Sequence, residues 1–304
     1  MNTQKKIKQK AREIGFDLIG ITDLSPSAYQ KEYRDSILKN SNENLKYLVE
    51  TEEGRLFPDV KFPWAKSVVV LGINYWQGSF HPPEKGEVLI SRYAIGKDYH
   101  IVLPEKLSVL AEFIKDELKA NKIECYTDTG PLLEKELAEK AGLGWIGKNK
   151  LLITEEFGSW VFLGEVLVDI ELNSDEPAEN KCGSCNICVS SCPSKALTGP
   201  YSLDVEKCTA FQTVKKKGPL PSWFPTENNN YVFGCDICQE VCPYNSGARM
   251  TKIKDFMPDK RIVNPSLDYL RSLSYDEFYS LFAHTPVDWA GRDVFLRNLE
   301  AFMK

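Results

Sequence analysis

The chain has 304 residues, of which 42% are hydrophobic and 27% are charged, and its formal net charge is −5. This acidic balance excludes a protein that wraps nucleic acid over its whole surface, although a local basic patch can still meet a folded RNA. No apolar run approaches the ~20 residues of a membrane helix, and no apolar segment follows the basic start, so we expect a cytoplasmic protein without a signal peptide or a membrane partner.

The first half of the sequence alternates between helical and extended patterns. Apolar residues at helical spacing, such as Ile7, Ala11 and Ile14, mark helices. Runs of apolar and β-branched residues mark strands. In chain order, the expected elements are a helix over 4–14, a strand over 16–22, a polar helical stretch to about 50, a loop over 53–58, a buried strand over 67–75, a loop over 76–88 and a helix over about 103–120.

The segment over residues 90–100 concentrates polar and aromatic side chains just before the last of these helices. It reads ISRYAIGKDYH and contains His100, one of 3 histidines in the chain. By itself the pattern favours an amphipathic turn that enters the helix. A lone histidine at such a place is more often hydrogen-bonded or at the surface than a metal ligand.

Asp128 follows a short predicted strand over residues 123–127 and precedes a predicted helix. Pro131 suits the first position of that helix, with Gly130 as a possible cap. A side chain at a strand-to-helix corner commonly faces a ligand. The alternative is an aspartate that only stabilises the turn, and the sequence physics leaves both open.

Residues 142–148 form a glycine-rich segment that resembles two nucleotide-binding motifs and satisfies neither. The dinucleotide fingerprint requires a strand before it and a helix after it, whereas here a helix precedes and a strand-like run over 151–154 follows. The P-loop requires Ser or Thr where Asn149 stands. We therefore expect a loop that lets backbone approach a large ligand closely. A long strand over 160–170 and a polar linker over 171–180 come next.

Eight cysteines crowd into residues 182–242. The first four, Cys182 to Cys192, fit C-x2-C-x2-C-x3-C-P, the bacterial ferredoxin spacing for [4Fe–4S] clusters, in which the cysteine before proline binds the other cluster. The second run lacks its third cysteine, because Val241 stands there, and Cys208 is the natural substitute. We assign cluster 1 to Cys182, Cys185, Cys188 and Cys242, and cluster 2 to Cys192, Cys208, Cys235 and Cys238.

Structural zinc is the alternative to iron–sulfur clusters, but zinc sites normally use separated C-x2-C pairs. Disulfides are disfavoured by the reducing compartment that we expect. The ninth cysteine, Cys125, is expected to be a small buried apolar residue.

After the cysteines, apolar spacing predicts short helices over 267–282 and a final helix over 293–304. Two clusters in series normally conduct single electrons. Because a long segment precedes them, the electrons are expected to serve a second cofactor or a substrate there. A reduction that needs a proton suggests Asp128 as general acid, with burial keeping it protonated.

The motifs together make the chain resemble the epoxyqueuosine reductase family. The resemblance rests on Arg92–His100 (RYAIGKDYH), Asp128–Glu134 (DTGPLLE), Ala141–Asn149 (AGLGWIGKN) and the double cluster pattern, in the family's order over nearly the whole chain. It implies an oxidoreductase that uses cobalamin and two [4Fe–4S] clusters to reduce epoxyqueuosine to queuosine at the wobble position of tRNA with a GUN anticodon. An external low-potential donor would supply the electrons, and we expect a monomer.

The resemblance also implies an architecture. It gives an α/β (α+β) nitroreductase-like cobalamin-binding domain with a mainly antiparallel sheet over 1–172. A ferredoxin-like double [4Fe–4S] domain over 173–248 and a short helical C-terminal segment over 249–304 follow. Many family members continue into HEAT-like repeats, whereas this sequence ends at Lys304.

Residue by residue, Asp128 matches the family's proton donor. The residues that match regions lining the corrin are Arg55, Arg92, Tyr93, Lys97, His100, Gly144, Trp145, Gly147 and Lys148. Candidate phosphate contacts are Lys215, Lys216, Lys217, Arg249, Lys252, Lys254, Lys260 and Arg261.

Three alternatives share parts of this pattern. A corrinoid reductive dehalogenase uses the same cofactors, but such enzymes typically carry a twin-arginine signal and a tyrosine donor. A ferredoxin-like electron carrier would bind clusters alone, and a corrinoid-activating reductase would serve another protein. Cobalamin in the purified protein would exclude the carrier.

Overall fold

A computed structural model describes residues 3–40, 42–227 and 229–303. The chain packs into two compact units, of which unit 1 comprises residues 1–74 and 99–185 and unit 2 comprises residues 75–98 and 186–304. The functional boundaries predicted at residues 172 and 248 stay a prediction. Within the described residues, no helix combines the length and the apolar character needed to cross a membrane.

Unit 1 is an α/β unit. Its helices and strands are α1 (Thr3–Ile14), β1 (Leu18–Thr22), α2 (Gln30–Lys39), α3 (Lys46–Glu50), α4 (Glu52–Leu56), α5 (Pro58–Lys61), β2 (Ser67–Asn74), α6 (Tyr99–Leu118), β4 (Ile123–Tyr126), α7 (Glu134–Lys140), β5 (Trp145–Ile146), β6 (Leu152–Ile153) and β7 (Val161–Val168). Most of the predicted elements are therefore present, with ends shifted by a few residues.

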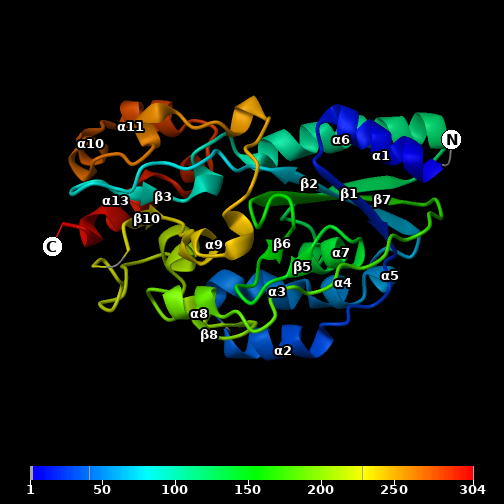
Figure 1. Ribbon diagram of the computed structural model, residues 1–304, viewed down its shortest axis with the longest axis horizontal. Coiled ribbons are helices and arrows are strands. Elements are labelled where there is room, and N and C mark those ends of the chain that lie inside the picture. The colour runs from blue at the N-terminus through cyan, green and yellow to red at the C-terminus, as the bar shows by residue number, and fades with distance from the viewer. Residues whose placement is uncertain (1–2, 41, 228, 304) are drawn as a thin grey trace. The chain divides into compact units, whose positions relative to one another are not determined.

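The centre of unit 1 is a 4-stranded sheet in the order β1-β2-β7-β4, and every neighbouring pair is antiparallel. The prediction of an antiparallel sheet is thus confirmed. Helices α1 and α6 pack on one face of the sheet and α7 packs on the other (Figure 1). All of β2 is buried, and its mostly apolar sequence suits a strand that is covered on both faces.

Two local predictions in unit 1 are wrong. Residues 53–58 form α4 and the start of α5 rather than a loop, because Pro58 takes the first position of a new short helix instead of only ending the segment. The helix after Asp128 begins at Glu134 rather than at Pro131. Residues 128–133 therefore make a longer corner loop than expected.

Unit 2 contains short elements. They are β3 (Leu89–Ile90), α8 (Ile187–Ser191), β8 (Leu197–Gly199), β9 (Ser202–Leu203), β10 (Tyr231–Phe233), α9 (Ile237–Glu240), α10 (Leu267–Ser272), α11 (Tyr275–Phe282), α12 (Pro286–Ala290) and α13 (Arg292–Ala301). Strands β3 and β10 pair in parallel, and the predicted C-terminal helices appear as α10, α11 and α13.

The core of unit 2 joins segments that lie far apart in the sequence. Val88, Ile90 and Ile95 pack with aromatic residues of α11 and α13 and with Phe233 of β10. Asn298 of α13 ties these pieces together, since its amide donates to the carbonyls of Thr213 and Val232, both at 2.8 Å. The segment over 75–98 therefore belongs to unit 2 through its packing.

Candidate active site

Asp128 lies where the sequence placed it, at the corner between β4 and α7. Two side chains at the start of α6 reach its carboxylate. The Tyr99 hydroxyl donates to Asp128 Oδ2 at 3.0 Å, and His100 Nε2 lies 3.4 Å from the same oxygen. The backbone of Asp128 is left-handed, with φ of 56°, a conformation that Asp tolerates better than most residues. Asp128 is thus held from α6 by groups that can orient its carboxyl.

Asp128 is not buried, contrary to the sequence-based expectation. Its side chain is 54% exposed, and that of His100 is 36% exposed. The left-handed backbone of Asp128 lies two residues after the end of β4. This exposure makes the side chains of Asp128 and His100 accessible to a ligand.

Arg55 of α4 holds the corner loop through its guanidinium. Its two terminal nitrogens donate to the carbonyls of Leu132 at 2.7 Å and Gly130 at 3.1 Å. Its Nε donates to Thr51 Oγ1 at 2.9 Å. A planar guanidinium with fixed donors suits this bridging of two carbonyls. Arg55 thus acts in the structure by fixing the backbone that carries Asp128.

Two further carboxyls stand behind Asp128. The Glu134 carboxylate accepts the backbone N–H of Asp128. Burial, and next the Asp128 charge, raise the pKa of Glu134 to about 7. Glu165 of β7 has no exposed surface, and burial raises the pKa of Glu165 well above its usual value, followed by the Glu134 carboxyl. Neither carboxyl was predicted from the sequence, although Glu165 is the one charged residue in Val161–Val168.

The glycine-rich segment forms the antiparallel β5–β6 pair, and its glycines are required by packing. A Cβ on Gly144 would lie 2.2 Å from the Ile153 carbonyl oxygen, and one on Gly147 would lie 2.4 Å from Ile153 Cδ1. Trp145 is 1% exposed. The neighbour that lies against these glycines in this structure is β6, and the predicted approach of a large ligand stays a prediction.

Lys148 anchors the loop that carries the first two cluster cysteines. Its ammonium donates to the carbonyl of Gly183 at 2.7 Å and to that of Cys185 at 2.8 Å. The side chain is nearly buried, at 8% exposure. Charged donors of this kind contribute about 1.5–3 kcal/mol for each hydrogen bond. The fold of this loop therefore depends on a lysine far upstream in the sequence.

We expect the substitution Lys148→Met to loosen this cysteine loop. The variant should lose iron faster than the wild type when both are held anaerobically with a chelator, and the loss should stop near half of the total. Iron per chain over time measures this effect. Lys181→Met is the matched control, because Lys181 is exposed and pairs with Glu155 instead. Equal rates of iron loss for wild type and Lys148→Met would remove the anchoring role.

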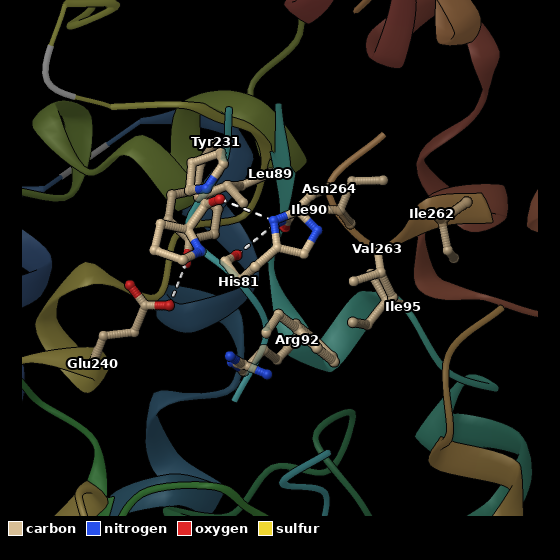
Figure 2. Close-up of a pocket in the computed structure, with 13 residues that line it drawn as sticks. His81, Leu89, Ile90, Arg92, Ile95, Tyr231, Glu240, Ile262, Val263 and Asn264 are labelled. Carbon is tan, nitrogen blue, oxygen red and sulfur yellow. Dashed lines mark hydrogen bonds between the residues drawn. The ribbon is translucent and has the colours of Figure 1, made fainter. Parts of the chain in front are cut away.

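Arg92, Tyr93 and Lys97 are bound within unit 2. The Arg92 guanidinium lies 4.2 Å from the centre of the Trp76 ring and 4.3 Å from that of Phe80. Lys97 Nζ lies 3.8 Å from the Asp255 carboxylate. Arg92 lines a pocket of about 300 Å³ in this unit, with Tyr231 and Glu240 on another wall (Figure 2). Their predicted contact with a corrin stays a prediction.

The four cysteines assigned to cluster 2 converge in unit 2. Burial raises the pKa of Cys235 and of Cys238, and the thiols of Cys208 and Cys192 raise both further. Cys208 and Cys238 also pack against the buried Cys192, Ala196 and Leu197. Burial thus raises the pKa of the Cys208, Cys235 and Cys238 thiols, whereas bound iron stabilises thiolates. The donor set thus fits an iron–sulfur cluster.

Structural zinc is the alternative that the sequence left for these cysteines. Within the described ranges, no group of three or more His, Cys, Asp or Glu side chains is arranged to hold one ion. A zinc ion requires its ligands at about 2.0–2.3 Å from one point, whereas a cubane spreads its ligands over its corners. The grouping of Cys182, Cys185, Cys188 and Cys242 as cluster 1 stays a prediction.

Two remaining predictions have different outcomes. Cys125 is exposed, so its expected burial is wrong, because β4 is the edge strand of the sheet. The candidate phosphate contacts stay predictions, and at least three already have protein partners, among them Lys216, whose Nζ lies 3.1 Å from the Glu206 carboxylate. Arg261 pairs with Asp259 at 2.6 Å, and Lys215 Nζ lies 4.4 Å from the centre of the Trp289 ring.

Two family models match the chain. Residues 55–129 match the model described as epoxyqueuosine reductase QueG, DUF1730, which spans Arg55 to Asp128. Residues 181–245 match a 4Fe-4S double cluster binding domain, which spans the eight clustered cysteines. Iron–sulfur binding is therefore supported by the motif, by the converging thiols and by the family model.

Several curated relatives and solved structures are named epoxyqueuosine reductase. An epoxyqueuosine reductase from Leadbetterella byssophila is 36% identical over 99% of this chain and 98% of its own length. The crystal structure of epoxyqueuosine reductase with a tRNA-Tyr epoxyqueuosine-modified tRNA stem loop matches with a TM-score of 0.87 at 34% identity, covering 99% of this chain and 80% of that chain. The Bacillus subtilis enzyme, described with its catalytic aspartate loop swung out of the active site, matches with a TM-score of 0.85 at 33% identity, covering 99% and 80%.

Reductive dehalogenases share the fold at a much lower level of identity. A catabolic reductive dehalogenase matches with a TM-score of 0.50 at 16% identity, covering 96% of this chain and 36% of that chain. This likeness concerns the fold and does not favour the dehalogenase alternative.

Proposed function

This chain belongs to the epoxyqueuosine reductase family, and from that premise we propose that it reduces epoxyqueuosine to queuosine at the wobble position of tRNA with a GUN anticodon. The observation that carries the proposal is the corner at Asp128. At this corner, Tyr99 and His100 hold an exposed carboxyl. The same chain also carries a double-cluster cysteine motif.

We propose two [4Fe–4S] clusters and cobalamin as the cofactors. When bound, the clusters supply single electrons at low potential, and cobalamin supplies a cobalt centre that can accept them. His100 fits a direct contact with the corrin, because its side chain is partly exposed beside Asp128. Arg55 and Lys148 fit an indirect role, since each holds the backbone of a functional loop. A nitroreductase-like origin of the antiparallel sheet would agree with this cofactor.

The remaining chemistry in this proposal belongs to the protein. Replacement of the epoxide by a double bond consumes two electrons and two protons, and the oxygen leaves as water. Asp128 donates a proton to the epoxide oxygen as general acid. Tyr99 and His100 orient its carboxyl from α6, and Arg55 keeps the corner loop in place.

The proposed enzyme needs two partners that the sequence analysis already suggested, a tRNA substrate and an electron donor. The substrate is a folded tRNA, whose phosphates would meet the basic residues after the cluster region. An external low-potential donor supplies the electrons, and the chain acts as a cytoplasmic monomer.

Anaerobic turnover tests the proposed function. The holoenzyme, loaded with iron and cobalamin and given a strong one-electron reductant, should convert epoxyqueuosine to queuosine in a modified tRNA stem loop. Nucleoside analysis by mass spectrometry measures the product. A matched stem loop that carries unmodified guanosine should remain unchanged. The substrate assignment fails if the fully loaded enzyme makes no queuosine while the reductant reduces its clusters.

A further inference from the structure

The loop that follows Cys208 in unit 2 is held in a fixed shape by α13. Arg297 of α13 donates to three backbone carbonyls of this loop, that of Gln212 at 2.8 Å and those of Lys216 and Gly218, both at 2.7 Å. A planar guanidinium with several fixed donors suits this bridging of carbonyls. The basic run over residues 215–217 therefore lies on a backbone that α13 already orders.

The three lysines of this run have different surroundings. Lys216 Nζ lies 3.1 Å from the Glu206 carboxylate, so an acidic partner offsets its charge. Lys215 and Lys217 are exposed, and Lys215 Nζ lies 4.4 Å from the centre of the Trp289 ring. The loop thus presents two exposed ammonium groups, one of which lies beside an aromatic ring.

Trp289 is a large aromatic side chain at the surface of α12. This helix is anchored through Val287, which is fully buried in the core of unit 2, whereas Trp289 is 65% exposed. An indole with this exposure buries little apolar area and so adds little to the stability of the fold. Its open surface can instead stack on a planar group of a ligand.

An exposed indole beside exposed lysines on an ordered loop fits single-stranded RNA. Unpaired bases stack on aromatic side chains, while ammonium groups contact the neighbouring phosphates. The whole chain has a net charge of −5, so a polyanion is attracted only where positive charge is concentrated locally. The proposed function supplies such a polyanion, because the loops of a tRNA present unpaired bases.

We propose that Trp289, Lys215 and Lys217 form a tRNA-binding surface. The indole stacks on an unpaired base, and the two ammonium groups contact the flanking phosphates. This role rests on the proposed tRNA substrate and adds to it the residues that contact the RNA. The surface supplies affinity and takes no part in the chemistry at Asp128. Arg297 is a positioning residue, since it acts on the RNA only through the backbone of the loop.

Binding of a fluorescently labelled tRNA transcript with a GUN anticodon tests this surface. The protein, loaded with iron and cobalamin, is titrated without reductant, and fluorescence anisotropy gives Kd at several salt concentrations. Trp289→Ala should weaken binding about 5- to 100-fold, the range for loss of one stacked base, while the salt dependence of Kd stays unchanged. Trp289→Phe keeps an aromatic ring and should recover most of the affinity.

The lysines are tested through the salt dependence itself. Lys215→Met and Lys217→Met should each lower the slope of log Kd against log salt concentration by about 1, because each removes one phosphate contact. Lys85→Met is the matched control, since Lys85 is exposed in another loop of unit 2 and its removal changes the net charge equally. Tyr275→Ala is the control for the ring, because Tyr275 is 64% exposed on α11. Both controls should bind tRNA like the wild type.

Three results would overturn this surface. They are a wild-type Kd for Trp289→Ala, an unchanged salt slope for both lysine variants, and equal losses of affinity in the two controls. Thermal unfolding and iron content should match the wild type in every variant, and Trp289→Phe and the lysine variants still test the surface if Trp289→Ala does not fold. If the wild-type protein did not bind the transcript at all, the proposed tRNA substrate itself would fail, which is a separate outcome.

Discussion

Asp128→Asn is expected to lower the rate of queuosine formation by about 10²–10⁴-fold, the range for loss of a general acid. Asparagine keeps the shape of the side chain and can accept from Tyr99, so the corner should keep its conformation. It also tolerates the left-handed backbone at this position. Because only the transferable proton is removed, kcat should fall while the KM for the stem loop and the iron and cobalamin contents stay at wild-type values.

Asp116→Asn is the matched control for this prediction. Asp116 is an exposed aspartate on α6, the helix that also supplies Tyr99 and His100. Its variant should turn over like the wild type at every pH. Wild-type activity of Asp128→Asn with both cofactors loaded would remove Asp128 from the mechanism. A raised KM with unchanged kcat would show instead that the carboxylate only binds substrate.

Cys235→Ser is expected to abolish turnover and to remove about four iron atoms per chain, the content of one [4Fe–4S] cluster. Cys235 lies among the buried thiols of unit 2, where the pKa of its thiol is raised by burial and by its neighbours. A serine hydroxyl at such a site is a poor ligand for iron. Without this cluster the electron path is interrupted, so queuosine formation should fall to background even with excess reductant.

Cys125→Ser provides the control for the cysteine prediction. Cys125 is an exposed residue of the edge strand β4 and belongs to neither cluster motif. Its variant should keep the full iron content and the wild-type rate. If Cys235→Ser bound as much iron as the wild type after anaerobic reconstitution, the assignment of this cysteine to a cluster would be wrong.

The sequence by itself determined the elements whose signals are local. Cysteine spacing predicted the iron–sulfur region, which agrees with the 4Fe-4S double cluster model over residues 181–245, because ligation of a cubane constrains residues that are close along the chain. The apolar run over 67–75 identified a strand buried on both faces, which is β2. The run DTGPLLE placed Asp128 at a corner, since turn and helix-start residues act on their immediate neighbours.

Only the tertiary structure decided which distant residues meet. Lys148 donates to the carbonyls of Gly183 and Cys185, and no local sequence pattern predicts that contact. Asp128 was expected to be protonated by burial, yet the buried carboxyl belongs to Glu165, on a strand that is distant in sequence. Burial depends on what packs against a group from the rest of the chain, and so does its ionisation. The sequence located the acid at the corner, whereas the fold placed the buried acids behind it.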